Sequence, residues 1–186
     1  MNAKNQSNFA IENQSTLYIM CGIPGSGKST WAKDFKEKIN AAGYYCVIVS
    51  RDEIRFKFLK ERGGRYFDYE KEVFKTYCQK IQEYLDRGYQ VIADATQINP
   101  RSRSNLLDNL EINENTIICC VDIDTPYSIC KRRNSKREGI KRVPDSVMKR
   151  MSLQKVTPTI YEYNGFSYDG IITVGFSEDE REKIYE

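Results

Sequence analysis

The hydrophobic and polar positions of the chain follow two alternating patterns. Short apolar runs rich in β-branched and aromatic residues predict buried strands at 16–20, 44–50, 89–96, 115–123 and 170–174. Between these runs, apolar residues spaced three and four positions apart predict helices at 29–39, 67–87 and 144–156. Because strands and helices alternate, the pattern predicts an α/β fold with a parallel five-stranded sheet and helices on both of its faces.

Local signals mark where several helices begin and end. Gly43 and Gly88 follow predicted helices and are typical C-terminal stops. Asn99 and Pro100 form an N-cap and first-turn pair, which predicts another helix at 100–110. These signals place the connections at the ends of the predicted strands, where the polar and charged residues gather.

A glycine-rich loop connects the first strand to the first helix. Its sequence CGIPGSGKSTW places Gly22, Gly27, Lys28 and Ser29 at the spacing GxxxxGK[ST]. In such a loop, backbone N–H groups surround phosphate oxygens, the lysine reaches the outer phosphates and the hydroxyl binds Mg²⁺. A chance match in a glycine-rich turn is disfavoured by the strand before it and the helix after it, and a dinucleotide-binding GxGxxG spacing is absent.

A carboxylate comes directly after the second strand. Ser50 and Glu53 stand in the S-x-x-E relation of a capping box, which places Asp52 in the first turn of a helix and Arg55 one turn further. An acidic residue there is ordinarily a partner for the helix dipole. A functional role is favoured because this strand opens on the same edge of the sheet as the glycine-rich loop.

Two later strands also end in carboxylates. The third predicted strand ends at Asp94, which resembles a Walker B element, although an aspartate that caps a strand end is the simpler alternative. Asp122 and Asp124 form a DxD that would suit a phosphatase nucleophile of the haloacid dehalogenase type. We reject that interpretation because no glycine follows Asp124 and Pro126 begins a helix at once.

Positive charge is concentrated in one stretch of a chain whose net charge is only +3. The cluster comprises Lys131, Arg132, Arg133, Lys136, Arg137, Lys141 and Arg142. A solvated helix face is the ordinary explanation of such a run. A lid is favoured here, because the run breaks at Gly139 and resumes before Pro144, which predicts a helix, a hinge and a second helix over the phosphate-binding edge.

Composition limits the remaining possibilities. A chain of 186 residues that is 40% hydrophobic and 12% aromatic fits one packed domain, which we place at 16–176 between a flexible tail at 1–15 and a charged tail at 177–186. The six cysteines form no CxxC pair, and we find neither a signal peptide nor a membrane span, so a reducing cytoplasmic setting is expected. Since histidine is absent, a general base must come from another group, such as a carboxylate.

The segments CGIPGSGKSTWAK, SRDEIR, ADATQINPRSR, KRRNSKR and VP…VMKRM together give the chain a family resemblance. In this order they resemble the phage-type polynucleotide 5′-kinase domain, which phosphorylates 5′-hydroxyl ends of DNA or RNA. The resemblance covers residues 17–174 and implies a P-loop NTPase three-layer sandwich with a helical lid. The phosphatase domain of the fused family members has no counterpart here, so the resemblance implies a separate 3′-phosphatase.

The resemblance also implies roles for particular residues. It assigns nucleotide binding to Gly22, Pro24, Gly25, Ser26, Gly27, Lys28, Ser29, Thr30 and Arg133. It implies catalytic roles for Lys28 on the donor phosphates, Asp52 as general base and Arg137 on the transferring phosphate. Acceptor contacts are implied for Asp52, Arg55, Asp94 and Thr96. Mg²⁺ is implied to bind Ser29 and, through water, Asp94.

The expected cofactors are therefore ATP or GTP with Mg²⁺. The expected partners are nucleic acid 5′-hydroxyl ends, a separate ligase and 3′-phosphatase, and a second copy of the chain in a homo-oligomer. No membrane partner is expected. The expected setting is the cytoplasm, or a host cytoplasm if the source is a phage. Two alternatives stay open: a P-loop kinase for a small hydroxyl compound, and a non-catalytic ATP-binding interaction module. The second alternative requires Lys28 but neither Asp52 nor Arg137.

Overall fold

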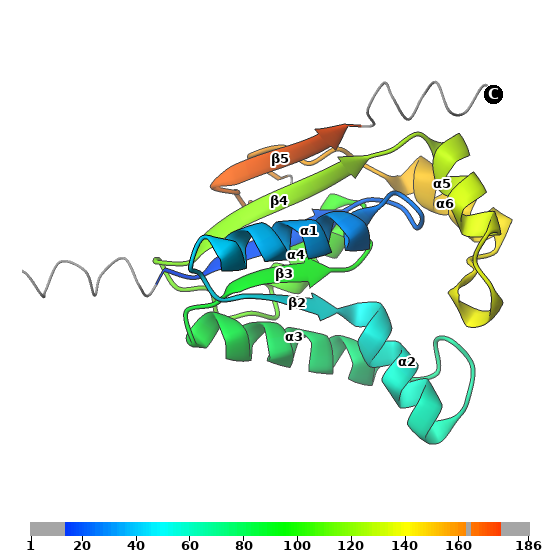
Figure 1. Ribbon diagram of the computed structural model, residues 1–186, viewed down its shortest axis with the longest axis horizontal. Helices are drawn as coiled ribbons and strands as arrows, with labels where there is room; N and C mark the ends of the chain where they lie inside the picture. Colours follow the sequence, from blue (N-terminus) through cyan, green and yellow to red (C-terminus); the bar gives the residue numbers. More distant parts are fainter. Residues whose placement is uncertain (1–13, 163–164, 176–186) are drawn as a thin grey trace, which may run out of the picture.

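The computed structural model describes residues 14–162 and 165–175, and the charged tail expected at 177–186 and most of the tail expected at 1–15 lie outside these residues. One sheet of five parallel strands runs through the described chain in the order β2-β3-β1-β4-β5 (Figure 1). The strands are β1 (Thr16–Cys21), β2 (Cys46–Ser50), β3 (Gln90–Asp94), β4 (Ile117–Asp124) and β5 (Gly170–Gly175). The predicted α/β fold with a parallel five-stranded sheet is confirmed.

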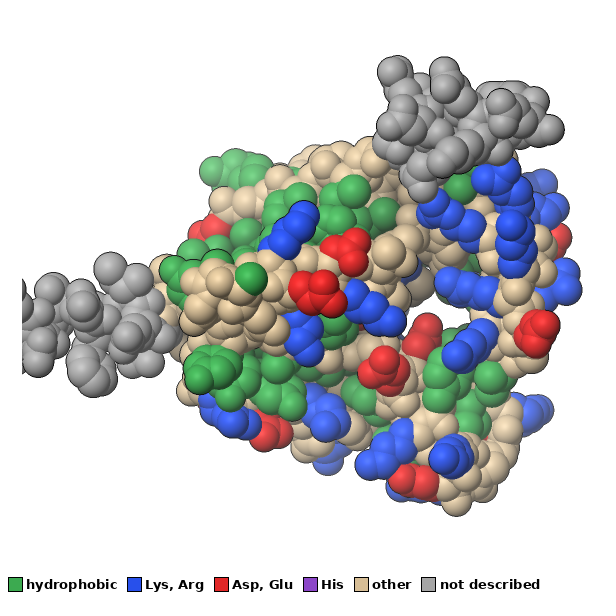
Figure 2. Space-filling model, in the orientation of Figure 1, with side chains coloured by type: hydrophobic (Ala, Val, Ile, Leu, Met, Phe, Trp, Pro, Cys, Tyr) green, Lys and Arg blue, Asp and Glu red, His purple; other side chains and the backbone are tan. Residues whose placement is uncertain are grey.

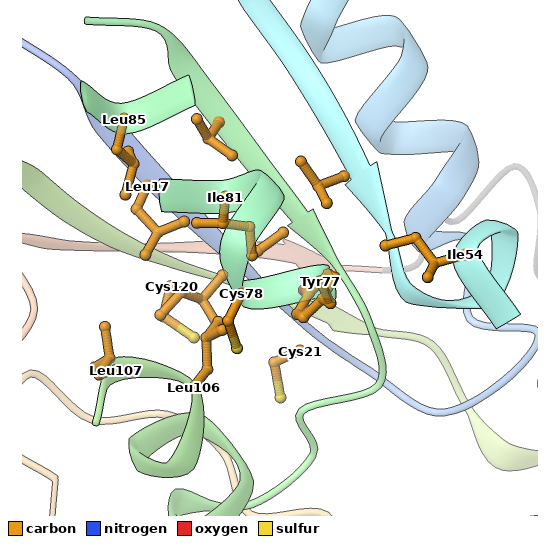
Figure 3. Close-up of a cluster of buried hydrophobic side chains, with 14 of the residues drawn as sticks. Leu17, Cys21, Ile54, Tyr77, Cys78, Ile81, Leu85, Leu106, Leu107 and Cys120 are labelled. Carbon is orange, nitrogen blue, oxygen red and sulfur yellow. The ribbon is translucent and has the colours of Figure 1, made fainter. Parts of the chain in front are cut away.

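Helices cover both faces of this sheet. On one face, α1 (Lys28–Ala41) packs Ala32, Trp31 and Phe35 against β1 and its neighbours. On the other face, α3 (Glu70–Asp86) and α4 (Pro100–Leu107) enclose the largest apolar cluster, in which Tyr77 and Ile81 are fully buried (Figure 3). Both faces of the parallel strands are thus removed from water, which explains their nearly continuous apolar sequences.

The helix boundaries follow the capping residues. Helix α1 ends in a Schellman motif in which the N–H of Gly43 donates to Asn40 and the N–H of Tyr44 donates to Ile39. Tyr44 therefore belongs to the helix stop, and the second strand begins at Cys46, two residues later than the apolar run predicts. Helix α2 (Arg51–Arg62) begins after Ser50, whose side chain accepts a hydrogen bond from the backbone of Glu53.

Three predicted helices are shorter than their patterns indicate, among them the one predicted at 144–156, which spans Asp145–Gln154. The helix predicted at 67–87 begins only at Glu70, because Asp68 accepts a hydrogen bond from the backbone N–H of Arg65 and holds residues 65–68 in a turn. Helix α4 begins at Pro100 as predicted, with a capping box between Asn99 and Ser102. It ends at Leu107 instead of position 110, where residues 108–110 continue as turns.

The basic segment folds into three short helical pieces beside the carboxyl edge of the sheet (Figure 1). They are α5 (Tyr127–Ser135), the 3₁₀ turn η1 (Gly139–Lys141) and α6 (Asp145–Gln154). Buried Asn134 joins the two ends of the segment between α5 and α6. Its side chain donates to the carbonyl of Val143 at 2.7 Å and accepts from the N–H of Val143 at 3.0 Å. The predicted helix, break and helix are present, with the short η1 turn inside the break.

No helix formed by the described ranges combines the length and the apolar composition needed to cross a bilayer.

Candidate active site

The glycine-rich loop between β1 and α1 is packed tightly against α5. Gly25 has a φ of +83°, and a Cβ at this position would lie 2.5 Å from the carbonyl oxygen of Cys130. A side chain is thus excluded both by the left-handed backbone and by the neighbouring helix. The loop glycine at this position fixes how closely the basic segment approaches the loop.

Two side chains of the basic segment bind the loop backbone. The hydroxyl of Thr125 donates to the carbonyl of Ser26 at 2.8 Å. Arg133 donates through Nη1 to the carbonyls of Ser26 and Gly25 at 3.3 and 3.4 Å. Arg133, which the resemblance assigns to the nucleotide, therefore lies directly on the phosphate-binding loop.

Lys28 is buried at the start of α1. Its Nζ donates to the carbonyls of Gly22 and Ile23 at 2.8 and 3.0 Å. Burial lowers the pKa of Lys28, while the carboxylates of Asp94 and Asp52 act in the opposite direction. A buried ammonium group beside a glycine-rich loop suits the binding of phosphate oxygens.

Ser29 and Asp94 lie together beside Lys28. The Ser29 hydroxyl donates to Oδ2 of Asp94 at 2.9 Å, so the predicted juxtaposition of these two residues is present. Burial raises the pKa of Asp94, and Lys28 and the Ser29 hydrogen bond partly oppose this shift. Mg²⁺ commonly binds one or two protein oxygens and completes its octahedron with phosphate and water, so this hydroxyl and carboxylate fit a nucleotide-bound Mg²⁺.

The described residues offer no set of three or more acidic, cysteine or histidine side chains arranged to hold a metal ion. Any Mg²⁺ at Ser29 and Asp94 would therefore take most of its ligands from phosphate and water. Thr96 lies just beyond Asp94, and its carbonyl accepts from the N–H of Gly22 at 3.4 Å, which connects the end of β3 to the loop.

Asp52 and Arg55 lie on the neighbouring strand end, at the start of α2. The Asp52 side chain is 63% exposed, whereas that of Arg55 is only 6% exposed, and the two form an ion pair. Arg55 also donates to Glu70, with Nη2 2.9 Å from Oε2, and to the hydroxyl of Tyr66 at 3.0 Å. The Arg55 guanidinium is thus fully engaged by protein groups and holds the exposed carboxylate of Asp52 in place.

The family resemblance assigns no role to Tyr66 and Glu70, which complete this network. Tyr66 donates to Oδ1 of Asp52 at 2.9 Å, and burial together with the Asp52 charge raises the pKa of Tyr66 to about 12. Glu70 also pairs with Arg51. Tyr66 lies in the connection before α3, and Glu70 is the first residue of α3. Their role follows only from the turn at 65–68, which folds α3 back onto α2.

Arg137 and Asp52 approach the site from opposite sides. Arg137 is exposed just after α5, and its charge lowers the pKa of Lys28, whereas that of Asp52 raises it, after the larger effects of burial and Asp94. Both residues are therefore near the phosphate-binding loop. Figure 2 shows a hollow between the segment of α5, η1 and α6 and the segment of α2, with basic and acidic side chains along its walls.

Two other charged groups from the sequence motifs have structural partners. Asp122 and Asp124 both pair with Nζ of Lys155, at 3.0 and 2.9 Å, in line with our rejection of a phosphatase nucleophile. Arg103, within the segment ADATQINPRSR, is completely buried and pairs with Glu162 at 2.7 Å. Arg103 therefore stabilises the fold beneath the site and does not face the hollow.

The fold and the loop together define a P-loop kinase-like protein. The chain belongs to the AAA domain family AAA_33, whose model matches residues 17–157. It is 28% identical over 142 residues to the L-seryl-tRNA(Sec) kinase of Methanococcus maripaludis, covering 76% of this chain and 53% of the relative, so it spans about half of that protein.

Solved structures agree with this assignment. A chain in the structure of the Pnkp1/Rnl/Hen1 RNA repair complex superposes with a TM-score of 0.63 at 28% identity, covering 82% of this chain and 46% of the other. The Mycobacterium tuberculosis APS kinase CysC, solved with AMPPNP and APS, shares the fold with a TM-score of 0.54 at 18% identity, covering 92% of this chain and 95% of its own.

Proposed function

We propose that this protein is a polynucleotide 5′-hydroxyl kinase that transfers the γ-phosphate of ATP or GTP to the 5′ end of DNA or RNA. The observation that carries the proposal is the position of Asp52. Its carboxylate is exposed at the carboxyl end of β2, at the same edge of the sheet as the phosphate-binding loop and close enough to Lys28 to affect its pKa. A base in that position suits a kinase and has no purpose in a protein that only binds nucleotide.

The donor side consists of the loop, Lys28 and Arg137. The loop glycines and Lys28 hold the β- and γ-phosphates, and Arg133 supports the loop from α5. Bound nucleotide would supply the phosphoryl group, and an Mg²⁺ ion held by Ser29 and, through water, by Asp94 would neutralise charge on the phosphates. Arg137 neutralises the charge that develops on the transferring group, a role worth about 10³–10⁵ in rate in related transfers.

On the acceptor side, Asp52 receives the proton of the 5′-hydroxyl. The hydroxyl oxygen forms a bond to the γ-phosphorus, the bond from that phosphorus to the bridging oxygen of the β-phosphate breaks, and the proton passes to Asp52. Arg55 and Tyr66 both bind Oδ1 of Asp52, so Oδ2 is the oxygen available to the hydroxyl. The loose transition state makes the hydroxyl acidic late in the reaction, so a carboxylate suffices as base.

The choice of a polynucleotide acceptor rests on the basic cluster and on the similarity to a chain of an RNA repair complex. Basic side chains line the wall of the hollow across from α2 (Figure 2), and such a wall suits a phosphate backbone. Thr96 and Asp94 would contact the acceptor from the end of β3. The partners we propose, as the family resemblance implies, are a ligase and a 3′-phosphatase acting on the same ends in the cytoplasm of the cell or host, together with a second copy of the chain in a homo-oligomer.

A second candidate is a kinase for another hydroxyl acceptor. It is favoured by the 28% identity to a seryl-tRNA(Sec) kinase and by 25% identity over 130 residues to the adenylyl-sulfate kinase of Clostridium acetobutylicum. This candidate uses the same donor site and the same Asp52, and differs only in what occupies the hollow.

The two candidates are separated by transfer of label from γ-labelled nucleotide. Matched DNA and RNA oligonucleotides with 5′-hydroxyl ends are incubated with ATP or GTP, beside adenylyl sulfate and seryl-tRNA. Label on the oligonucleotides supports the proposal and identifies the preferred acceptor and donor in one experiment. Label only on adenylyl sulfate or on seryl-tRNA supports the second candidate.

A further inference from the structure

Half-buried Tyr66 and exposed Phe67 form an aromatic pair that borders the proposed acceptor side of the site. Phe67 is 65% exposed and lies in the connection between α2 and α3. Its ring contacts that of Tyr66 edge to face, with 4.7 Å between centroids. Unlike Phe58 and Tyr69 nearby, Phe67 belongs to none of the apolar clusters of the described chain, so packing does not explain its presence.

The pair is joined directly to the residues that activate the acceptor. The guanidinium carbon of Arg55 lies 4.5 Å from the centroid of the Tyr66 ring and 5.9 Å from that of Phe67. The same Arg55 and the Tyr66 hydroxyl both bind Oδ1 of Asp52. The exposed face of Phe67 is therefore separated from the Asp52 carboxylate by only one guanidinium group and one phenol ring.

These contacts also fix where the aromatic surface lies. The turn at 65–68 is held by Asp68, which accepts from the backbone of Arg65 and pairs with its side chain. Tyr66 is held by two hydrogen bonds. Phe67 therefore lies in a turn whose conformation is already fixed, so ligand binding does not have to pay the entropic cost of ordering that turn.

A 5′-terminal nucleoside whose hydroxyl meets Asp52 carries its base on the same sugar, within reach of this surface. Every nucleobase has a flat π face that stacks on an aromatic side chain, whatever its sequence. We propose that Phe67 is the stacking surface for the terminal base of the acceptor, with Tyr66 as its support. This inference rests on the proposed function and deepens it, because it distinguishes a nucleoside-bearing acceptor from a compact polar one.

The test compares Phe67→Ala and Phe67→Trp with the wild-type protein on two acceptors. One is a 5′-hydroxyl oligonucleotide, and the other has the same sequence with an abasic tetrahydrofuran unit at its 5′ end. We expect Phe67→Ala to raise KM for the first acceptor on the order of tenfold, with KM for ATP unchanged. We expect Phe67→Trp to bind the normal acceptor at least as well as wild type, and the abasic acceptor to respond to neither change.

The matched control is Tyr45→Ala. Tyr45 is 75% exposed but precedes β2, at the opposite end of that strand from Asp52, so its removal leaves KM for both acceptors unchanged. Thermal unfolding of each variant verifies that the fold is intact. The inference is overturned if wild type labels the oligonucleotide and Phe67→Ala raises KM equally for normal and abasic ends, or not at all. A wild-type protein that labels neither oligonucleotide overturns the proposed function itself.

Discussion

The buried ion pair of Arg103 and Glu162 allows a quantitative test of how the site is supported. Their side chains are 0% and 4% exposed, and Arg103 binds Glu162 through both Nη2 and Nε, at 2.7 and 2.9 Å. Nη1 of Arg103 also donates to the carbonyls of Gln97 and Val156, each at 3.2 Å. The Arg103 guanidinium thereby joins α4 to the segment before it, at Gln97, and to a segment after it, at Val156. It lies directly beneath the loop that begins at Cys21.

Removing one partner of this pair leaves the other charge buried without compensation. Such a change costs about 3–5 kcal/mol, so we expect Glu162→Ala to lower the free energy of unfolding by that amount. For a chain of this size the loss corresponds to a fall in Tm of about 6–20 °C. The double variant Arg103→Met with Glu162→Leu removes both charges, and although it forfeits the hydrogen bonds to Gln97 and Val156, we expect it to recover more than half of the loss.

The measurement is urea unfolding followed by circular dichroism, with the m-value required to stay constant across variants. The control is Glu72→Ala, which removes the exposed partner of Arg62 in a pair with the similar distance of 2.8 Å. Because that pair lies in water, its loss is worth less than about 1 kcal/mol. If Glu162→Ala were no more destabilising than Glu72→Ala, the structural role assigned to Arg103 would be refuted.

Three further predictions concern the site itself. Since the pKa of Asp94 is raised above its ordinary value of 3.8, ionised Asp94 destabilises the folded protein, and Asp94→Asn should unfold at higher urea concentration than wild type at pH 7. This gain in stability should be absent below both the ordinary and the raised pKa, and should appear as the pH rises through them. The same variant should lose Mg²⁺-dependent transfer. A stability difference independent of pH would contradict this. Gly25→Ala should abolish ATP binding in an equilibrium titration because its Cβ would collide with Cys130. The control Gly43→Ala has a similar φ of +90° but open space around it, so it should lower the free energy of unfolding by only about 1–2 kcal/mol and keep ATP affinity. Equal ATP affinity of the two variants would be inconsistent with the packing described. Tyr66→Phe keeps the ring but removes a hydrogen bond to Asp52, so kcat should fall about tenfold with KM for ATP unchanged, and an unchanged kcat would show that the bond does not orient the base.

Much of the fold was readable from the sequence because local and long-range signals agree. The apolar runs identified all five strands, and glycine and asparagine signals located helix ends to within a few residues. Some predicted boundaries of strands and helices were wrong because a local hydrogen bond determines the conformation there. Examples are the helix stop at Tyr44, which delays β2, and the turn closed by Asp68, which delays α3.

Within the site, the sequence predicted only the proximity of residues that share a short motif or follow strands at the same edge of the sheet. The loop residues and the pairing of Ser29 with Asp94 follow from motif spacing and from the shared edge of the sheet. By contrast, Glu70, Tyr66 and Lys155 reach their partners through tertiary contacts across 11 to 33 positions, from Tyr66 with Arg55 to Lys155 with Asp122, for which the sequence has no periodic signal. The roles of Asp52, Arg55 and Arg137 in chemistry remain predictions.

The central claim is that Asp52 serves as the base for a hydroxyl acceptor beside a nucleotide held by the loop. The most direct measurement is transfer of label from γ-labelled ATP to a 5′-hydroxyl oligonucleotide by wild type and Asp52→Asn, with ATP affinity measured in parallel. We predict that wild type labels the oligonucleotide, and that Asp52→Asn binds ATP with wild-type affinity but transfers no label. Near-normal labelling by Asp52→Asn would contradict the account.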